Sequence, residues 1–250
     1  MIRNRILFAF AFAGLALAPL CPASGSPTLQ INNVGPGGGI PGDYSTITFG
    51  STTVEVYTGE ASATLVNGST STNFYTFCVD LTDQINTVPT DPFNVTQLPT
   101  SSGLSNGNAA AYLYGKYAST STMITGGTLE GYNLTANDYS AALQLAIWDL
   151  VDGVTLKNGV LSGGITIDAL NAYNTISLAT MQAVVKALVT DALTNGQNTS
   201  GSWWQADPPF PPTGAQSFLA APAPSTFVLA VVALGCVLPV VRYRRSRLLA

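Results

Sequence analysis

The chain has 250 residues, with 13 acidic side chains, nine basic ones and no histidine. Six of the nine basic residues are arginines close to the two ends, so the long central part holds three lysines against all 13 acids, a formal charge of −10. This balance excludes the basic face that nucleic-acid binding needs. The missing histidine excludes Ser-His-Asp and Cys-His hydrolase sites and removes the usual histidine ligands of zinc.

The first 25 residues predict a secretory signal peptide. Arg3 and Arg5 precede a short apolar run at residues 6–18, and small residues and prolines follow as far as Ser26. This order of charged, apolar and small-residue regions is typical of an export signal, and the apolar run is too short to span a bilayer comfortably. We therefore expect an exported protein, cleaved between Ala23 and Ser26.

The first half of the remaining chain predicts β structure. Residues 26–43 are rich in Gly and Pro and indicate an ordered edge or a flexible lead-in. Residues 44–66 alternate β-branched and polar side chains, which predicts a hairpin broken near Gly59. Asn67-Gly68 is a turn signal, and the aromatic run at residues 73–81 is typical of a strand.

The second half predicts helices. Residues 137–152 give the clearest signal, because Asn137 or Thr135 can cap the N-terminus and Gly153 follows the end. This helix is apolar nearly all round, so we expect it to be buried. The other expected elements are a long loop or short strand pair, two more helices and a return strand, at residues 82–107, 108–117, 177–193 and 200–210. Together they predict one α+β domain over residues 26–206, with hairpins, a small sheet or a barrel in its first half.

The C-terminal part has a sequence of segments unlike the domain before it. A Pro-rich stalk at residues 207–221 leads to Pro-Ala-Pro-Ser-Thr at residues 222–226, an apolar run at residues 227–241 and an arginine cluster at residues 242–250. The apolar run predicts a transmembrane helix, since arginines at its end extend its effective length and place that end in the cytoplasm. A plain tail anchor is one interpretation.

The order of these segments resembles the PEP-CTERM sorting signal of Gram-negative bacteria. The residues that carry the resemblance are the motif Pro222, Pro224, Ser225 and Thr226 and the basic tail Arg242, Arg244, Arg245 and Arg247. Ala223 stands where the family has Glu. The resemblance implies that an exosortase-type machinery is a partner, that the C-terminal helix enters the membrane, and that the protein reaches the cell surface or extracellular matrix.

One cysteine and one glutamine stand out within the body. Cys21 lies in the signal peptide and Cys236 in the C-terminal apolar run, so Cys78 has no second cysteine in the body with which to form a disulfide. A buried, inert Cys78 is the structural alternative. Gln144 lies in the middle of the expected buried helix, where an unsatisfied amide costs about 1–3 kcal/mol. Its side chain is therefore either hydrogen-bonded to a strand edge or covalently joined to another group.

The surroundings of these two residues resemble the thioester domains of bacterial surface adhesins. Cys78 stands in Phe77-Cys78-Val79-Asp80, and Gln144 begins Gln144-Leu145-Ala146-Ile147-Trp148. The segment Tyr112-Leu113-Tyr114-Gly115 is similar to the helix that precedes the Gln helix there. The likeness extends over residues 44–206, and Leu143 stands where the family usually has Thr.

The resemblance implies a specific chemistry. The Cys78 sulfur attacks the side-chain carbonyl of Gln144, ammonia leaves, and the internal thioester is then opened by an amine such as a partner's lysine. Phe77 and Trp148 are supporting candidates that exclude water. Asp80 and Asp149 are candidate bases because the chain has no imidazole. The implied protein is a single-turnover covalent binder, not an enzyme, and needs no metal or cofactor.

Two other functions remain open from the residues themselves. A passive matrix or biofilm protein would contain Cys78 and Gln144 as packing residues only. A secreted polysaccharide hydrolase would pair carboxylates as acid and base, with Asp80 and Asp83 or Asp149 and Asp152 as the candidates.

Overall fold

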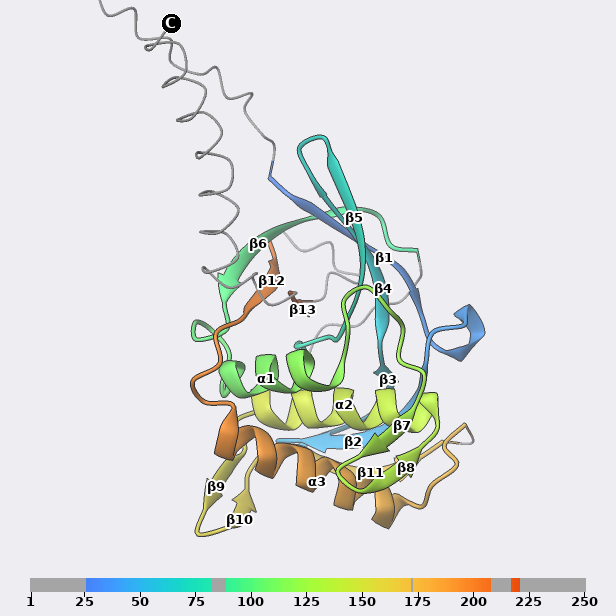
Figure 1. The fold of residues 1–250 in the computed structure, drawn as a ribbon, viewed down its shortest axis with the longest axis vertical. Helices are drawn as coiled ribbons and strands as arrows, with labels where there is room; N and C mark the ends of the chain where they lie inside the picture. The colour runs from blue at the N-terminus through green and yellow to red at the C-terminus, as the bar shows by residue number, and fades with distance from the viewer. Residues whose placement is uncertain (1–25, 82–88, 172, 208–216, 221–250) are drawn as a thin grey trace, which may run out of the picture.

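A computed structural model describes residues 26–81, 89–171, 173–207 and 217–220 (Figure 1). These residues form an α+β fold in which strands dominate the first half and helices follow, as the sequence predicts. A six-stranded antiparallel sheet has the order β13-β12-β6-β1-β4-β5. Its strands are β1 (Thr28–Val34), β4 (Ala61–Asn67), β5 (Thr70–Thr76), β6 (Phe93–Pro99), β12 (Ser202–Ala206) and β13 (Phe218–Leu219).

A three-stranded sheet and two hairpins complete the β structure. The sheet has the order β11-β2-β3, and the hairpins are β7–β8 and β9–β10. Their bounds are β2 (Gly42–Phe49), β3 (Thr52–Gly59), β11 (Thr166–Leu170), β7 (Gly127–Leu129), β8 (Tyr132–Leu134), β9 (Thr155–Lys157) and β10 (Val160–Ser162), and a short 3-10 helix η1 (Pro36–Gly38) follows β1. Each sheet has an apolar face that is buried only when another element packs on it, so both sheets need a partner layer.

Helix α2 (Ala136–Val151) provides that partner layer. It packs against α1 (Gly107–Tyr117), α3 (Leu178–Asn195), β2 and β3. In Figure 1 it lies between α1, which faces the six-stranded sheet, and the layer of β2, β11 and α3. Thr135 caps its N-terminus by accepting the Asp138 N–H, and Gly153 follows its end with a φ of +90°. The predicted buried helix is therefore confirmed, together with its cap.

Several predicted elements differ from the observed ones at the start of the chain. Residues 28–34 form β1, which lies inside the six-stranded sheet between β6 and β4, although its Gly- and Pro-rich surroundings predicted an edge or lead-in. Leu29 and Ile31 are fully buried there, and these two side chains fix the strand in place. The predicted hairpin at 44–66 is three strands, because a turn at Gly50 separates β2 from β3 and the chain changes sheet at Glu60.

The end of the domain also differs from the prediction. The return strand β12 is confirmed, and it pairs with β6 from Ser202–Pro99 to Ala206–Val95. Residues 217–220 were predicted as part of a Pro-rich stalk, but Phe218 and Leu219 form β13 and are buried. Apolar burial therefore extends the domain past residue 206. The predicted signal peptide and the predicted transmembrane helix lie outside the described residues. In the ranges that are described, none of the helices is long and apolar enough to cross a membrane.

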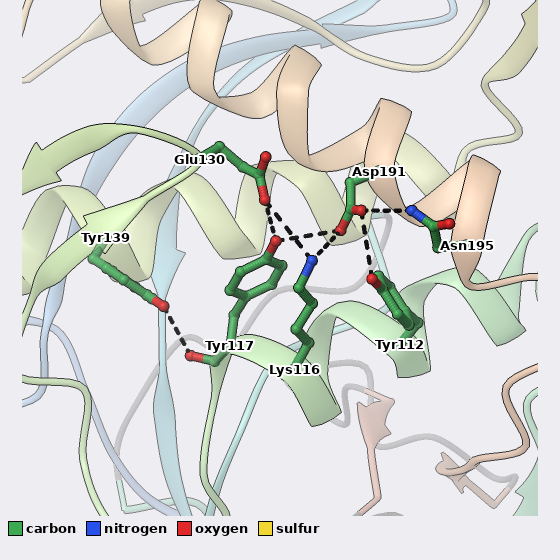
Figure 2. A network of polar contacts seen from close by, with 7 residues as sticks. All are labelled: Tyr112, Lys116, Tyr117, Glu130, Tyr139, Asp191 and Asn195. Carbon is green, nitrogen blue, oxygen red and sulfur yellow. Dashed lines mark hydrogen bonds and ion pairs between the residues drawn. The ribbon is translucent and has the colours of Figure 1, made fainter.

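A polar cluster on the surface ties α1 and α3 to the turn between β7 and β8 (Figure 2). We call it the Lys116 network. Lys116 Nζ lies 2.8 Å from Asp191 Oδ2 and 4.0 Å from Glu130 Oε1, and it stands over the ring of Tyr117 with 4.7 Å to the ring centre. The network comprises Tyr112, Lys116, Tyr117, Glu130, Tyr139, Asp191 and Asn195.

The charges in the Lys116 network stabilise one another. The hydrogen bond to Asp191 is the main reason that the pKa of Lys116 is raised. Burial by itself would raise the pKa of Asp191, but the hydrogen bonds from Lys116 and Asn195 outweigh it and lower that pKa. Since Lys116 is partly exposed, solvent screens much of this interaction.

We expect Lys116→Met to lower the free energy of unfolding by roughly 0.5–1.5 kcal/mol, because it removes two ion pairs and the cation–π contacts and leaves two carboxylates near each other. Urea denaturation measures this change, which should shrink in 1 M salt as charges are screened. The control is Lys186→Met, at an exposed lysine on α3. Equal effects of the two variants would show that the network adds nothing.

Candidate functional site

Cys78 is held in place by the last described segment of the chain. It lies just beyond the end of β5, where it forms an isolated antiparallel bridge with Phe218. The Val79 N–H donates to Ser217 O at 2.9 Å, and the Leu219 N–H donates to Phe77 O at 3.0 Å. The main chain around Cys78 is therefore fixed as if it continued the strand.

The Gln144 side chain meets the main chain of Cys78 directly. Its Oε1 accepts the Cys78 N–H at 3.0 Å, and its Nε2 donates to Cys78 O at 2.8 Å. Gln144 is 1% exposed, so both hydrogen bonds lie away from water. The structure thus brings together the two residues that the sequence singled out, and the buried amide is satisfied at both of its ends.

The Cys78 sulfur faces the residues that follow it in the chain. The Asp80 N–H donates to Sγ at 3.2 Å, and the thiol donates to Asp80 O at 3.1 Å. A cavity of about 230 Å³ lies against this group. Its wall includes residues from both sheets and from α2, namely Val34, Tyr44, Glu55, Val56, Tyr57, Gly59, Ala61, Cys78, Asp80, Leu81, Gln144, Trp148 and Phe218.

The charge and the aromatic lining of this cavity suit a cationic, partly apolar ligand. Glu55 and Asp80 are the charged residues of the wall, and both are acidic. Tyr44 and Tyr57 meet edge-on, with ring centres 5.8 Å apart. Carboxylates and aromatic faces both attract an ammonium group.

Trp148 belongs to the cavity wall and Phe77 does not. Trp148 lies one helical turn after Gln144 and is 3% exposed. Its indole N–H has no acceptor among the described residues. Phe77 is fully buried and packs edge-on against Tyr114, with ring centres 6.2 Å apart. Phe77 therefore supports the site from behind, through packing.

Asp149 lies away from the cavity wall, in contrast to Asp80. Its Oδ1 accepts the Ile165 N–H at 2.8 Å, which ties the chain before β11 to the end of α2. Burial raises the pKa of Asp149 to about 6, the Ile165 N–H opposes this rise, and the nearby Asp152 adds to it. Asp149 thus makes a structural contact with Ile165 and does not belong to the cavity wall beside Cys78.

The remaining candidate residues from the sequence lie outside the described part of the chain, and the described part contains no cluster of metal ligands. Asp83, the sorting motif Pro222, Pro224, Ser225 and Thr226, and the basic tail Arg242, Arg244, Arg245 and Arg247 lie outside the described residues. Within the described ranges, no three His, Cys, Asp or Glu side chains gather as a metal site would require.

Sequence reasoning missed the part of the site that comes from distant segments. Phe218, Tyr44, Tyr57 and Glu55 line the cavity although nothing local marks them. The strand alternation of β2 and β3 predicts that their side chains divide between two faces, but not which face meets Cys78. A two-residue strand such as β13 carries no periodic signal at all.

Comparison with known proteins gives one match. Residues 75–194 match the family model of the thioester domain, a span that includes Cys78, Gln144 and most of α3. No curated protein and no solved structure matches the chain. The family match supports a thioester-domain body and agrees with the contact between Cys78 and Gln144.

We expect Asp149→Asn to raise the free energy of unfolding near pH 7.5 by about 1–2 kcal/mol. Because burial raises the pKa of Asp149 from 3.8 to about 6, the folded state holds this proton more tightly, and the carboxyl costs stability as pH rises from 4 through 6. Asn keeps an oxygen for the Ile165 N–H and removes the charge. Thermal melts between pH 4 and pH 8 measure the gain, which should vanish near pH 4.

The matched control is Asp91→Asn, at an exposed aspartate. A pH slope should remain in both variants, since burial raises the pKa of Glu60 to about 7 and makes it act in the same direction. A loss of stability in Asp149→Asn at pH 7.5 would contradict this interpretation of Asp149.

Proposed function

We propose that the described domain forms an internal thioester between Cys78 and Gln144 and uses it to attach covalently to an amine-bearing partner. The observation that carries the proposal is the double hydrogen bond between the Gln144 amide and the Cys78 main chain. The family match over residues 75–194 supports the same function. The protein acts once per molecule as an adhesive and is not an enzyme.

Bond formation starts from the contact already in place. The Cys78 sulfur attacks Cδ of Gln144, the carbon–nitrogen bond breaks, and Nε2 takes the thiol proton and leaves as ammonia. The Cys78 N–H at Oε1 stabilises the negative charge that develops on that oxygen. Because folding fixes both groups, the reaction gains the large effective concentration of an intramolecular step. Burial of Gln144 keeps water from the thioester that results.

Attachment to a partner is the second step. The nitrogen of an incoming amine attacks the same carbon, the carbon–sulfur bond breaks, and the sulfur leaves with the proton that the amine loses. The products are an amide to the partner and a restored Cys78 thiol. The cavity beside Cys78 carries Glu55 and Asp80, so its field draws an ammonium group toward the thioester, and the ammonium releases one proton to solvent before its nitrogen attacks. A lysine side chain on another protein has this chemistry.

The mass of the native protein tests the proposal. We expect wild-type protein to be lighter than its calculated mass by one ammonia, and Cys78→Ala and Gln144→Ala each to have the full mass. Treatment with methylamine should add one methylamine to the wild type and make Cys78 reactive toward iodoacetamide. Full mass and immediate alkylation of native wild-type protein would favour the passive matrix protein in which the two residues only pack.

We also propose that the protein is exported and sorted to the cell surface or matrix through a PEP-CTERM-like signal. The support is in the sequence, in the apolar segment after Arg3 and Arg5 and in the order of residues 222–250. An exosortase-type machinery and the membrane are then its partners during export.

Replacing Arg242, Arg244, Arg245 and Arg247 together by Gln tests this sorting. We expect the variant to lose surface exposure, because its apolar segment no longer has cytoplasmic positive charge to fix its orientation. Protease treatment of whole cells, followed by immunoblotting of the body, measures the exposed fraction. The control replaces Lys157 and Lys186 by Gln. An unchanged exposed fraction in the four-arginine variant would rule out sorting through this tail.

A further inference from the structure

Trp148 contains a buried donor that the resting structure leaves unused. Its indole Nε1 has no hydrogen-bond acceptor among the described residues. The indole of Trp203, which is also buried, donates to Ser102 O at 3.0 Å. A buried N–H without an acceptor costs about 1–3 kcal/mol. Burial of the ring explains the presence of an aromatic residue at this position, but it does not explain the unpaired N–H.

The place of Trp148 on α2 connects it with Gln144. The two residues are four positions apart on one helix, so their side chains share a face. Long side chains of a helix lean toward its N-terminus, which directs the indole of Trp148 over the turn that carries Gln144. Both residues line the same cavity beside Cys78.

The reacting oxygen has room for a second donor. In the amide, Gln144 Oε1 accepts one hydrogen bond, from the Cys78 N–H. A carbonyl oxygen has two lone pairs, and it becomes an oxyanion when the carbon is tetrahedral. A donor that is unpaired in the resting state and paired in the transition state raises the rate, because it stabilises the transition state alone.

We propose that the Trp148 indole N–H is the second oxyanion donor of the site, beside the Cys78 main-chain N–H. The inference rests on the proposed thioester function. When sulfur or an incoming amine attacks Cδ of Gln144, the carbonyl π electrons move to the oxygen, and the indole N–H donates to it. As the tetrahedral state collapses, the carbonyl reforms and either ammonia or the Cys78 sulfur leaves. The indole keeps its proton throughout.

Removal of the N–H without loss of the ring tests the proposal. The sharpest change replaces Trp148 with 3-benzothienylalanine, in which sulfur stands in place of the N–H, and Trp148→Phe is the second variant. We expect the second-order rate of reaction with methylamine, followed by intact mass, to fall about 100-fold or more. Formation of the thioester after refolding should slow as well.

Stability separates this role from simple packing. Because the lost N–H had no partner, the benzothienyl variant should be as stable in urea as the wild type, or slightly more stable. The control is Trp203→Phe, which removes an N–H that is bonded to Ser102 O and should lose stability while keeping the wild-type methylamine rate. Substitution of Trp148 therefore changes rate, and substitution of Trp203 changes stability.

The outcomes distinguish this inference from the function on which it rests. A wild type of full mass overturns the thioester and the donor together. A wild type that lacks one ammonia, with a benzothienyl variant that reacts at the wild-type rate, overturns the donor alone. If Trp148→Phe fails to fold, the benzothienyl variant decides the question, since it keeps the shape of the indole.

Discussion

The site depends on the pairing of the Gln144 amide with the main chain of Cys78. An amide in the middle of an apolar helix is costly unless both its donor and its acceptor are used. Here the Cys78 N–H and carbonyl satisfy both ends. The same two hydrogen bonds fix the Gln144 carbon beside the residue that carries the thiol. One contact thus meets a requirement of stability and a requirement of chemistry.

This pairing needs a scaffold that holds two distant segments in register. Helix α2 is fixed because it packs against α1, α3, β2 and β3. Cys78 is fixed because residues 217–220 add β13 to the sheet and bond to the main chain on either side of it. Phe218 also closes one wall of the cavity. The last described residues of the domain are therefore as necessary to the site as the helix that carries Gln144.

The hydrogen-bonded groups of the Lys116 network have the opposite energetics to the unused donor in the cavity. The Lys116 network stabilises the packing of α1 on α3, whereas burial makes the Asp149 carboxylate costly near neutral pH although its hydrogen bond to Ile165 ties a loop to α2. The Trp148 N–H has no described acceptor and lowers stability in the resting state. Natural proteins tolerate such local conflicts chiefly at functional sites. The same contrast explains why Trp148 and Trp203 should respond differently to substitution.

The sequence by itself determined the α+β class, the three helices, a cap at either Thr135 or Asn137, and the two reactive candidates. Helix periodicity, capping residues and an isolated cysteine are local features, and a buried glutamine conflicts visibly with its apolar neighbours. It did not determine that β1 lies inside a sheet, that β13 exists, or that Asp149 bonds to Ile165 and lies outside the cavity wall. Only the tertiary structure decided these points, because strand order, cavity walls and hydrogen-bond partners come from contacts between segments far apart in the chain. The sequence also shows that the body is acidic, but only folding brings two of its acidic residues, Glu55 and Asp80, to the cavity beside Cys78.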